Sequence, residues 1–178
     1  MDSLKIIQKF YRTDSLAYNI LVTHSRCVTR KALDMALRHP ELHADTDFIS
    51  QAAMLHDIGI FQCCAPDLDC HGSEPYIRHG IIGADILRNE GLPLHARVCE
   101  RHTGTGITPS DIREQHLPLP EQDFSPVSVE EQIICFADKF FSKTHPDRER
   151  SPQQVLDSMQ KFGERSVARI LDWQQRFL

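Results

Sequence analysis

The 178-residue sequence contains no long hydrophobic run. Nowhere do about eighteen apolar residues follow one another, which argues against a membrane-spanning helix and a membrane partner. The opening stretch MDSLKIIQKF scatters charges among its apolar residues and so lacks the hydrophobic centre of a secretory signal peptide. We therefore expect a cytoplasmic protein.

An excess of basic residues is also absent. Lys and Arg number 20 against 25 Asp and Glu, which gives a formal net charge of -5 at pH 7. Proteins that bind a nucleic-acid backbone usually present a basic surface to its phosphates. The charge balance therefore argues against nucleic acid as an obligatory partner.

Paired metal-binding cysteines are missing as well, although six cysteines are present. Without an export signal, structural disulfides are not expected. A zinc knuckle is the alternative for one group, which consists of Cys63, Cys64, Cys70 and His71. Adjacent cysteines lack the usual ligand spacing and no second pair follows, so a separate structural zinc is disfavoured.

Most of the chain has the periodicity of amphipathic helices, and no stretch alternates convincingly with period two. The longest helix is predicted over 15–38, with Asp14 or Thr13 as its N-cap and Pro40 just after its end. Further helices are expected at 3–11, 76–90, 94–102, 128–144, 152–162 and 164–176. This pattern predicts an all-α, compact helical bundle.

A shorter helix is predicted to begin near Asp45 or Thr46 and to end at Asp57. Gly59 is placed to take the left-handed turn that closes it. Another glycine, Gly91, is expected to end the helix before Pro93 in the same way.

Two long connections interrupt the helices, at 60–75 and 103–127. In the second, TPSD at 108–111 predicts a short helical turn, with Thr108 as its cap and Pro109 at its first position. Loops of this length in a compact domain are usually functional or disordered. No repeat or shift in composition marks a second domain, so residues 1–178 are expected to form a single domain.

Polar side chains recur where the helical pattern points inward. They are His24, His79, His102 and Asp138. A single inward histidine is most simply a core residue that is satisfied by a hydrogen bond. A buried carboxylate is more costly, and Lys139, as the next residue on a helix, points about 100° away from Asp138.

The stretch AAMLHDIGIF, residues 52–61, places His56 and Asp57 together at the end of a buried helix. A cation between them would turn two costly buried groups into ligands. The same cation would account for the other inward-facing polar residues. Periodicity supplies only their inward direction, and it does not show that they meet.

The ordered pattern of His24, His56-Asp57 and Asp138 resembles the HD-domain superfamily of metal-dependent phosphohydrolases. HDIG at 56–59 matches the form common among bacterial members. The similarity covers roughly 20–145 and includes HGIIGADILRNEGLP and CERHTGTGIT, which look like segments that give many relatives two further histidines. The resemblance implies an HD core over that range, with C-terminal helices at 148–177 packed on it.

The resemblance also implies two metal ions. One would be held by His24, His56, Asp57 and Asp138, and the other by His79 and His102, with Asp57 bridging both. Two cations about 3.5–4 Å apart share a hydroxide and clamp the oxygens of a phosphoryl group. Mixed imidazole and carboxylate ligands suit divalent iron, manganese, cobalt, nickel or zinc.

Basic residues close to these ligands are candidates for binding phosphate. They are Arg78, Arg101, Lys139 and Lys143. Lys139, beside Asp138, is the preferred catalytic partner of Asp57, whereas the alternative for each basic residue is a solvated surface charge. His71, in the loop after HDIG, is a further candidate for contact with the substrate, although a surface position is the simpler interpretation.

The implied activity is hydrolysis of a phosphate monoester or diester in a small phosphorylated metabolite or nucleotide. Small size and acidic balance favour such a substrate over a polymer, and the GYP signature of the cyclic di-GMP branch is absent. The same ligands resemble those of di-iron oxygenases within the superfamily. A noncatalytic regulatory module stabilised by metal is a third alternative, and a homodimer is compatible with the sequence.

Overall fold

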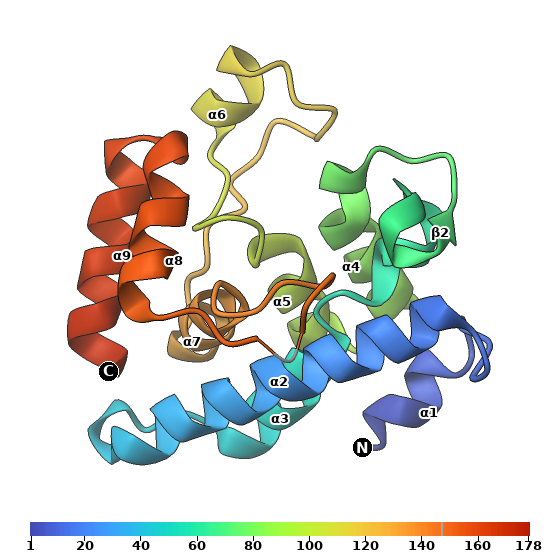
Figure 1. Cartoon of the computed structure of the whole chain (residues 1–178), viewed down its shortest axis with the longest axis horizontal. Coiled ribbons are helices and arrows are strands. Elements are labelled where there is room, and N and C mark those ends of the chain that lie inside the picture. The colour runs from blue at the N-terminus through green and yellow to red at the C-terminus, as the bar shows by residue number, and fades with distance from the viewer. Residues whose placement is uncertain (147) are drawn as a thin grey trace.

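A long helix, α2, runs along one side of the molecule, and shorter helices pack above and beside it (Figure 1). The computed structural model describes residues 1–146 and 148–178. Its α-helices are α1 (Ser3–Ile7), α2 (Leu16–Arg38), α3 (Thr46–Leu55), α4 (His79–Asn89), α5 (Pro93–Arg101), α6 (Pro109–Glu114), α7 (Val129–Asp138), α8 (Pro152–Met159) and α9 (Glu164–Phe177). The all-α prediction is confirmed.

Short elements complete the chain. The 3-10 helices are η1 (Pro40–Leu42), η2 (Ile58–Gln62), η3 (Pro66–Leu68), η4 (Tyr76–Arg78) and η5 (Gln160–Phe162). A two-stranded antiparallel hairpin, β1 (Cys64–Ala65) and β2 (Cys70–His71), pairs Cys64 with His71. Its strands are too short for a period-two pattern to be visible in the sequence.

Several helix ends differ from the predicted ones. The N-cap of α2 is Ser15, whose side chain accepts a hydrogen bond from the Tyr18 amide, so the prediction of Asp14 or Thr13 was wrong. The predicted helix at 128–144 ends six residues early, at Asp138. The cap of α3 at Asp45 and the capping box of α6 at Thr108 are as expected.

The role predicted for Gly59 was also wrong. Gly59 is not among the residues with positive φ. A Cβ at this position would lie 2.3 Å from the His79 carbonyl oxygen and 2.5 Å from the Gly83 amide nitrogen. Glycine is therefore required because η2 packs directly on the backbone of α4. Gly91, by contrast, does end α4 with a φ of +76°.

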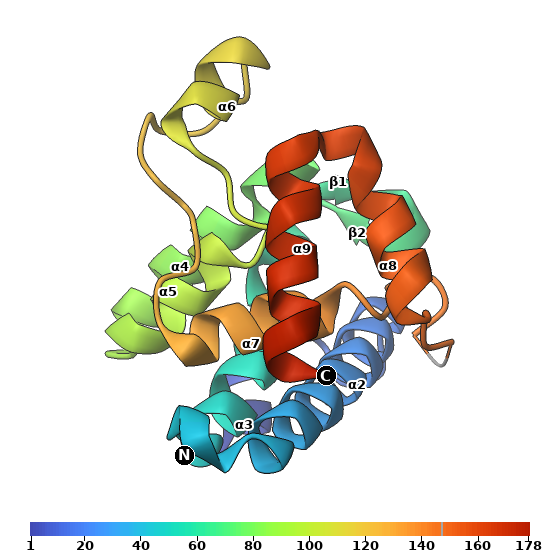
Figure 2. The same cartoon turned by 90° about the vertical axis from the view of Figure 1, so that its left-hand side faces the viewer.

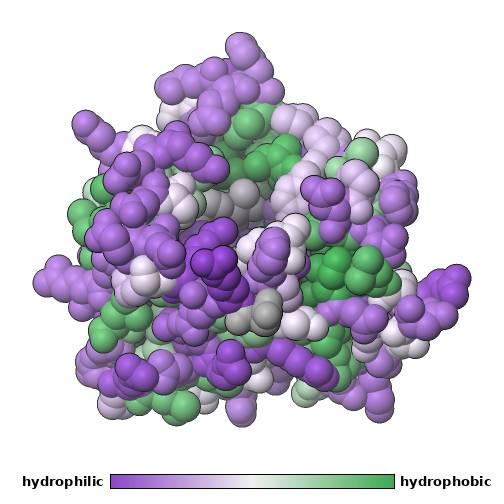
Figure 3. Space-filling model, viewed as in Figure 1, coloured by the Kyte–Doolittle hydropathy of each residue, from purple (hydrophilic) through white to green (hydrophobic). Residues whose placement is uncertain are grey.

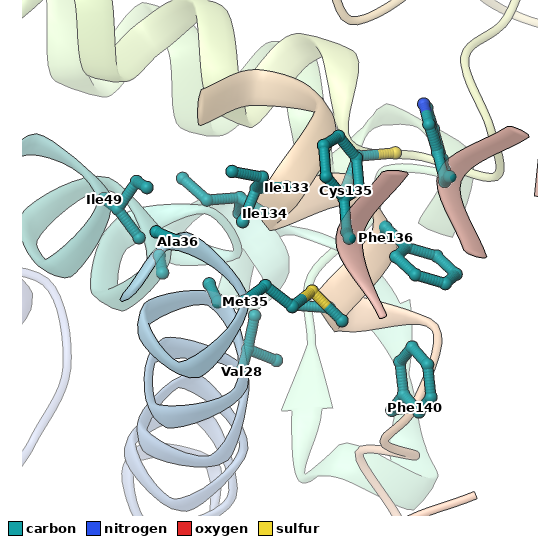
Figure 4. Close-up of a cluster of buried hydrophobic side chains, with 14 of the residues drawn as sticks. Val28, Met35, Ala36, Ile49, Ile133, Ile134, Cys135, Phe136 and Phe140 are labelled. Carbon is teal, nitrogen blue, oxygen red and sulfur yellow. The ribbon is translucent and has the colours of Figure 1, made fainter. Parts of the chain in front are cut away.

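The larger part of the core lies between α2, α3, α7 and the C-terminal helices. Figure 4 shows Val28 and Met35 of α2 facing Ile133 and Phe136 of α7. From α9, Trp173 is 2% exposed, and its ring centroid lies 5.9 Å from that of Phe136. In Figure 2, α9 lies beside α7 and α8 lies beside α9, so these helices cover one side of the core.

A second apolar cluster joins α1, η2, α4 and α5. Within the described residues, no helix is both long and apolar enough to cross a bilayer. The six cysteines are free thiols.

Candidate metal centre

Six polar residues from five helical segments meet between the two apolar clusters. His24 lies within α2, and Asp138 is the last residue of α7. His56 and His102 are the C-caps of α3 and α5, whereas His79 begins α4 and Asp57 follows His56. All six are buried, Asp138 being the most exposed at 8%. The structure thus brings together every residue for which the sequence predicted metal binding.

His56, His79 and His102 share one hydrogen-bonding pattern. In each ring, Nδ1 lies 2.7 Å from the carbonyl oxygen of the residue three positions earlier. A carbonyl oxygen only accepts, so Nδ1 carries the proton and donates it. Nε2 is left to face the cluster, which is the arrangement usual for histidines that bind metal.

The first group of ligand atoms surrounds Asp57 Oδ2. This oxygen is 3.3 Å from His24 Nε2 and 3.1 Å from His56 Nε2. Asp138 Oδ1 is 3.0 Å from His24 Nε2 and 3.6 Å from His56 Nε2. Ligand atoms that each lie about 2.1 Å from one cation are separated by roughly 3.0–3.4 Å in octahedral or tetrahedral geometry. The spacing of this group suits a divalent cation.

The second group surrounds the other oxygen of the same carboxylate. Asp57 Oδ1 is 3.4 Å from His79 Nε2 and 3.3 Å from His102 Nε2. Burial, followed by the neighbouring His102, lowers the pKa of His79 to about 3, and burial also lowers the pKa of His102. Both rings are therefore neutral at pH 7.

The contact between the His79 and His102 rings tests most directly whether these residues fit a metal ion. The two Nε2 atoms are 3.0 Å apart. Because Nδ1 holds the proton in each neutral ring, two lone pairs face each other at this distance. A cation that accepts both lone pairs removes the repulsion, and the residues present therefore fit a metal ion.

Buried polar atoms that lack hydrogen-bond partners also indicate a metal site. Asp57 Oδ1 and His56 Nε2 have no hydrogen-bond partner within the described residues, and Asp57 Oδ2 has only its ion pair with Lys143. A buried carboxylate without such partners is costly. Coordination would satisfy all three atoms at once.

The local electrostatics favour positive charge. Burial lowers the pKa of His56, but the carboxylates of Asp57 and Asp138 outweigh it and raise this pKa to about 9. Burial would raise the pKa of Asp57, yet the charges of His56 and Lys143 hold it well below its usual range. Burial would also raise the pKa of Asp138, yet the charges of Lys139 and Lys143 hold it well below its usual range. The two carboxylates therefore remain ionised and attract cations.

Two lysines contact the carboxylates differently. Lys139 Nζ is 2.6 Å from Asp138 Oδ2 and donates to the His102 carbonyl oxygen at 3.1 Å. Lys139 is 9% exposed, so it connects the ends of α5 and α7 inside the protein. Lys143 Nζ is 2.8 Å from Asp57 Oδ2, and Lys143 also lines an open cavity of about 460 Å³. Lys143 thus joins the centre to this open cavity, which we call the entrance.

Tyr76 lines the same cavity and was missed by the sequence analysis. Its ring stacks on that of His79, with centroids 4.7 Å apart and an interplanar angle of 25°. The Tyr76 carbonyl also accepts the His79 Nδ1 proton. A tyrosine three residues before an inward-facing histidine was the available signal.

The other candidate substrate-binding residues have partners elsewhere. Arg78 pairs with Glu74 at 2.7 Å, and Arg101 pairs with Glu131 at 3.3 Å. His71 has a side chain 71% exposed, with Asp69 at 3.3 Å. Substrate binding by these three residues stays a prediction. Within the part of the chain described, the cysteines belong to neither group of atoms spaced for a metal.

The fold and this buried cluster define an all-helical protein with a His/Asp site suited to divalent cations. A model of the HD-domain family matches residues 21–142, a range that contains the six clustered residues. The chain belongs to the HD-domain family.

Curated relatives extend the comparison. The tRNA (cytidine(56)-2'-O)-methyltransferase of Thermoplasma volcanium is 31% identical over 91% of this chain and 43% of its own length. The uncharacterized protein MJ0778 of Methanocaldococcus jannaschii is 32% identical over 85% of this chain and 83% of its own length. The methyltransferase of the same name from Picrophilus torridus is 32% identical, and the match covers 36% of it. The chain thus spans less than half of either methyltransferase. No solved structure matches significantly.

Proposed function

We propose that this protein is a metal-dependent phosphohydrolase that cleaves a phosphate ester of a small metabolite or nucleotide at a dinuclear centre. The observation that carries the proposal is that the two oxygens of the Asp57 carboxylate face different pairs of histidines. Asp57 Oδ2 faces His24 and His56, whereas Oδ1 faces His79 and His102. A bridging carboxylate with imidazoles on both sides suits two cations.

When bound, two such cations supply Lewis acidity and an acidified water to a phosphoryl group. The protein's own residues hold the charge and the geometry. Asp57 and Asp138 provide negative charge, and the backbone carbonyls fix three imidazoles in one tautomer. Lys143 is placed to donate to a phosphate oxygen that enters through the cavity, and Lys139 keeps Asp138 aligned with the end of α5.

The entrance favours phosphate chemistry over oxygen activation. The same ligand types serve either reaction, because irons suit both. Lys143, however, places an ammonium group beside the ligands and at the mouth of the cavity. A fixed cation at this position suits an anionic substrate.

Methyl transfer to tRNA is not carried over to this chain. That activity is stated for relatives of which this chain spans 43% and 36%. The net charge of -5 also gives no general attraction for an RNA backbone.

The test is a screen of metals against substrates. Protein stripped by a chelator is reloaded with iron, manganese, cobalt, nickel or zinc, and elemental mass spectrometry measures the bound metal. We expect close to two cations per chain, as for other two-metal sites, and phosphate release from at least one ester. Oxygen uptake is followed in parallel, with His56→Ala as the negative control. Folded protein that holds metal but cleaves no phosphate ester would overturn the proposal.

A further inference from the structure

Tyr11, which follows α1, is a buried polar residue outside the cluster of six. Its side chain is 6% exposed, and its hydroxyl makes two hydrogen bonds to one backbone segment. The hydroxyl donates to the Ile58 carbonyl oxygen at 3.0 Å and accepts from the Phe61 amide at 3.1 Å. Both partners belong to η2, which begins directly after Asp57. Tyr11 therefore connects the N-terminal segment to the turn beside the metal centre.

The two backbone groups that Tyr11 contacts are a pair that a 3-10 helix brings together. In such a helix the amide of one residue faces the carbonyl three residues earlier, as Phe61 faces Ile58 in η2. The hydrogen bonds of a 3-10 helix have poorer geometry than those of an α-helix. A hydroxyl that bridges the donor and the acceptor therefore strengthens this short element.

The orientation of Asp57 depends on η2. The Asp57 carbonyl oxygen accepts a hydrogen bond from the Ile60 amide at 3.1 Å, whereas its side chain makes no capping hydrogen bond to the turn. The side chain is thus left to the metal centre, where its oxygens lie 3.1–3.4 Å from four imidazole nitrogens. A small shift of η2 would move both oxygens relative to the histidines.

Packing holds the Tyr11 side chain in place. Figure 1 shows α1 beside the N-terminal half of α2, and Figure 3 shows hydrophobic side chains gathered at the surface on that side of the molecule. The Tyr11 amide donates to the carbonyl of Ile7, which is fully buried in the apolar cluster that joins α1 to η2. The Tyr11 ring meets that of Phe61 edge-on, with centroids 5.1 Å apart. The hydroxyl cannot leave η2 without disturbing these contacts.

The hydroxyl also keeps its proton. Burial raises the pKa of Tyr11 far above its ordinary value. The group is therefore neutral at any pH at which the protein is studied, and it can donate to Ile58 while it accepts from Phe61.

Tyr11 lies outside the part of the chain that the family model matches. That match begins at residue 21, and the six clustered residues all lie within it. A segment that precedes the family range thus contacts the HDIG turn.

We propose that Tyr11 is a positioning residue of the metal centre, whose hydroxyl fixes η2 so that the Asp57 carboxylate is oriented to bind metal. The inference rests on the metal centre of the proposed function, but it does not depend on hydrolysis of any substrate.

The first experiment removes the hydroxyl and measures metal binding. Tyr11→Phe keeps the ring and its contact with Phe61. Chelator-stripped protein is titrated with Co²⁺, whose visible absorption reports both affinity and ligand geometry. We expect the Kd for Co²⁺ to rise about 10–100-fold, the range typical of groups that orient a metal ligand, and the spectrum of the saturated protein to change. Tyr18→Phe is the matched control, since the Tyr18 hydroxyl accepts a hydrogen bond from the exposed Gln8 side chain at 3.1 Å.

A second variant separates positioning from stability. Ile7→Ala truncates a buried side chain of the same segment but keeps the Tyr11 hydroxyl. We expect a lower melting temperature, as for other cavity-forming substitutions, with the affinity and spectrum of bound Co²⁺ close to those of the wild type. Equal losses of affinity in Ile7→Ala and Tyr11→Phe would overturn the proposal, because Tyr11 would then act through stability alone.

A third measurement needs no variant. Coupling between two sites is reciprocal, so if η2 orients Asp57 for metal, bound metal must in turn stabilise η2. Hydrogen exchange at the Phe61 amide should therefore slow when Zn²⁺ is added to the stripped protein. The comparison is the Phe124 amide, which belongs to the second long loop and donates to the Ile107 carbonyl at 2.9 Å. We expect the slowing at Phe61 to exceed that at Phe124.

The outcomes distinguish this proposal from the hydrolase function. If the wild-type protein binds no metal, both fail. If Tyr11→Phe binds Co²⁺ as the wild type does, or if Zn²⁺ slows exchange equally at Phe61 and Phe124, the positioning role is refuted while the hydrolase function stands. If Tyr11→Phe loses affinity as expected but the wild type cleaves no phosphate ester, the positioning role stands and the hydrolase function fails.

Discussion

At the scale of the residue, Asp57 concentrates the chemistry of the centre in one side chain. Its two oxygens face different pairs of imidazoles at 3.1–3.4 Å. Replacement by asparagine keeps the shape but removes the charge and one of the two acceptor oxygens. Both groups should therefore weaken together.

We expect Asp57→Asn to lower kcat/KM by more than about 100-fold, beyond the 10–100-fold effect typical of residues that only support a ligand. Elemental mass spectrometry should show the loss of both cations. Asp85→Asn, at a side chain 77% exposed on α4, is the matched control. Two retained cations in Asp57→Asn would show that this carboxylate does not bridge.

Substitution by methionine should have a different effect at each of the two lysines. Lys139→Met leaves Asp138 and the His102 carbonyl without their buried partner, so the free energy of unfolding should fall by about 3–5 kcal/mol. In the metal-loaded enzyme, Lys143→Met should instead raise KM at least about tenfold, because one charge-assisted hydrogen bond to phosphate is lost. Urea unfolding and steady-state kinetics distinguish the two variants. If Lys143→Met lost stability and Lys139→Met raised KM instead, Lys139 would be the lysine that contacts the substrate.

The six clustered residues were predictable because buried polar side chains on apolar helix faces demand an explanation. The choice between Lys139 and Lys143 was not predictable in the same way. A helix continued to 144 places both lysines on one face, one turn apart. Because α7 ends at Asp138, the chain changes direction, and Lys143 lies at the entrance instead.

At the scale of the element, close contact between η2 and α4 sets the separation of Asp57 from His79. Gly59 has no room for a Cβ, since the obstructing atoms belong to the backbone of α4. Neither backbone can yield as a flexible side chain would. The two segments must therefore move apart if residue 59 gains a side chain.

We expect Gly59→Ala to loosen the group that contains His79 before the group that contains His24. Metal content should fall from about two cations towards one, and the melting temperature should fall as overpacking usually requires. Gly91→Ala is the control, because Gly91 has a positive φ but nothing within 4 Å of an added Cβ. It should cost stability without changing the metal content. Two cations in Gly59→Ala would show that the contact does not position His79.

Helix existence followed from periodicity, whereas several boundaries did not. Capping residues compete within a few positions, as Ser15 does with Asp14 at the start of α2. The glycine of HDIG was misinterpreted because a tight contact and a left-handed turn leave the same trace in sequence. Only the distance to α4 separates the two explanations.

At the scale of the whole molecule, the C-terminal helices support the segment that ends in Asp138. Trp173 and Phe177 of α9 lie against Phe136, with ring centroids 5.9 and 6.3 Å away. Phe136 is two residues before Asp138. Packing on this side of the core therefore stabilises a helix that carries part of the centre.

We expect Trp173→Ala to lower the free energy of unfolding by about 3–5 kcal/mol, the usual cost of truncating a buried aromatic residue. Urea denaturation followed by circular dichroism measures the change, since removal of the lone tryptophan abolishes its fluorescence signal. Leu171→Ala, two residues earlier on α9 and half exposed, should change stability by less than about 0.5 kcal/mol. A comparably small effect of Trp173→Ala would mean that α9 contributes little to the fold.

The meeting of five helical segments was beyond the reach of periodicity. Each pattern assigns an inward face to one helix, and it does not say which helices share an interior. Resemblance to the HD-domain family supplied the expected cluster.

His24 and Asp138 are 114 positions apart in the chain and lie 3.0 Å from each other. A cation held between them would act as a reversible crosslink that closes most of the polypeptide into one loop. Metal supply should then influence how much of the protein is folded, because an ion that binds only the folded chain shifts the folding equilibrium towards it. A cell short of that ion would lose the protein to proteolysis as well as losing its activity.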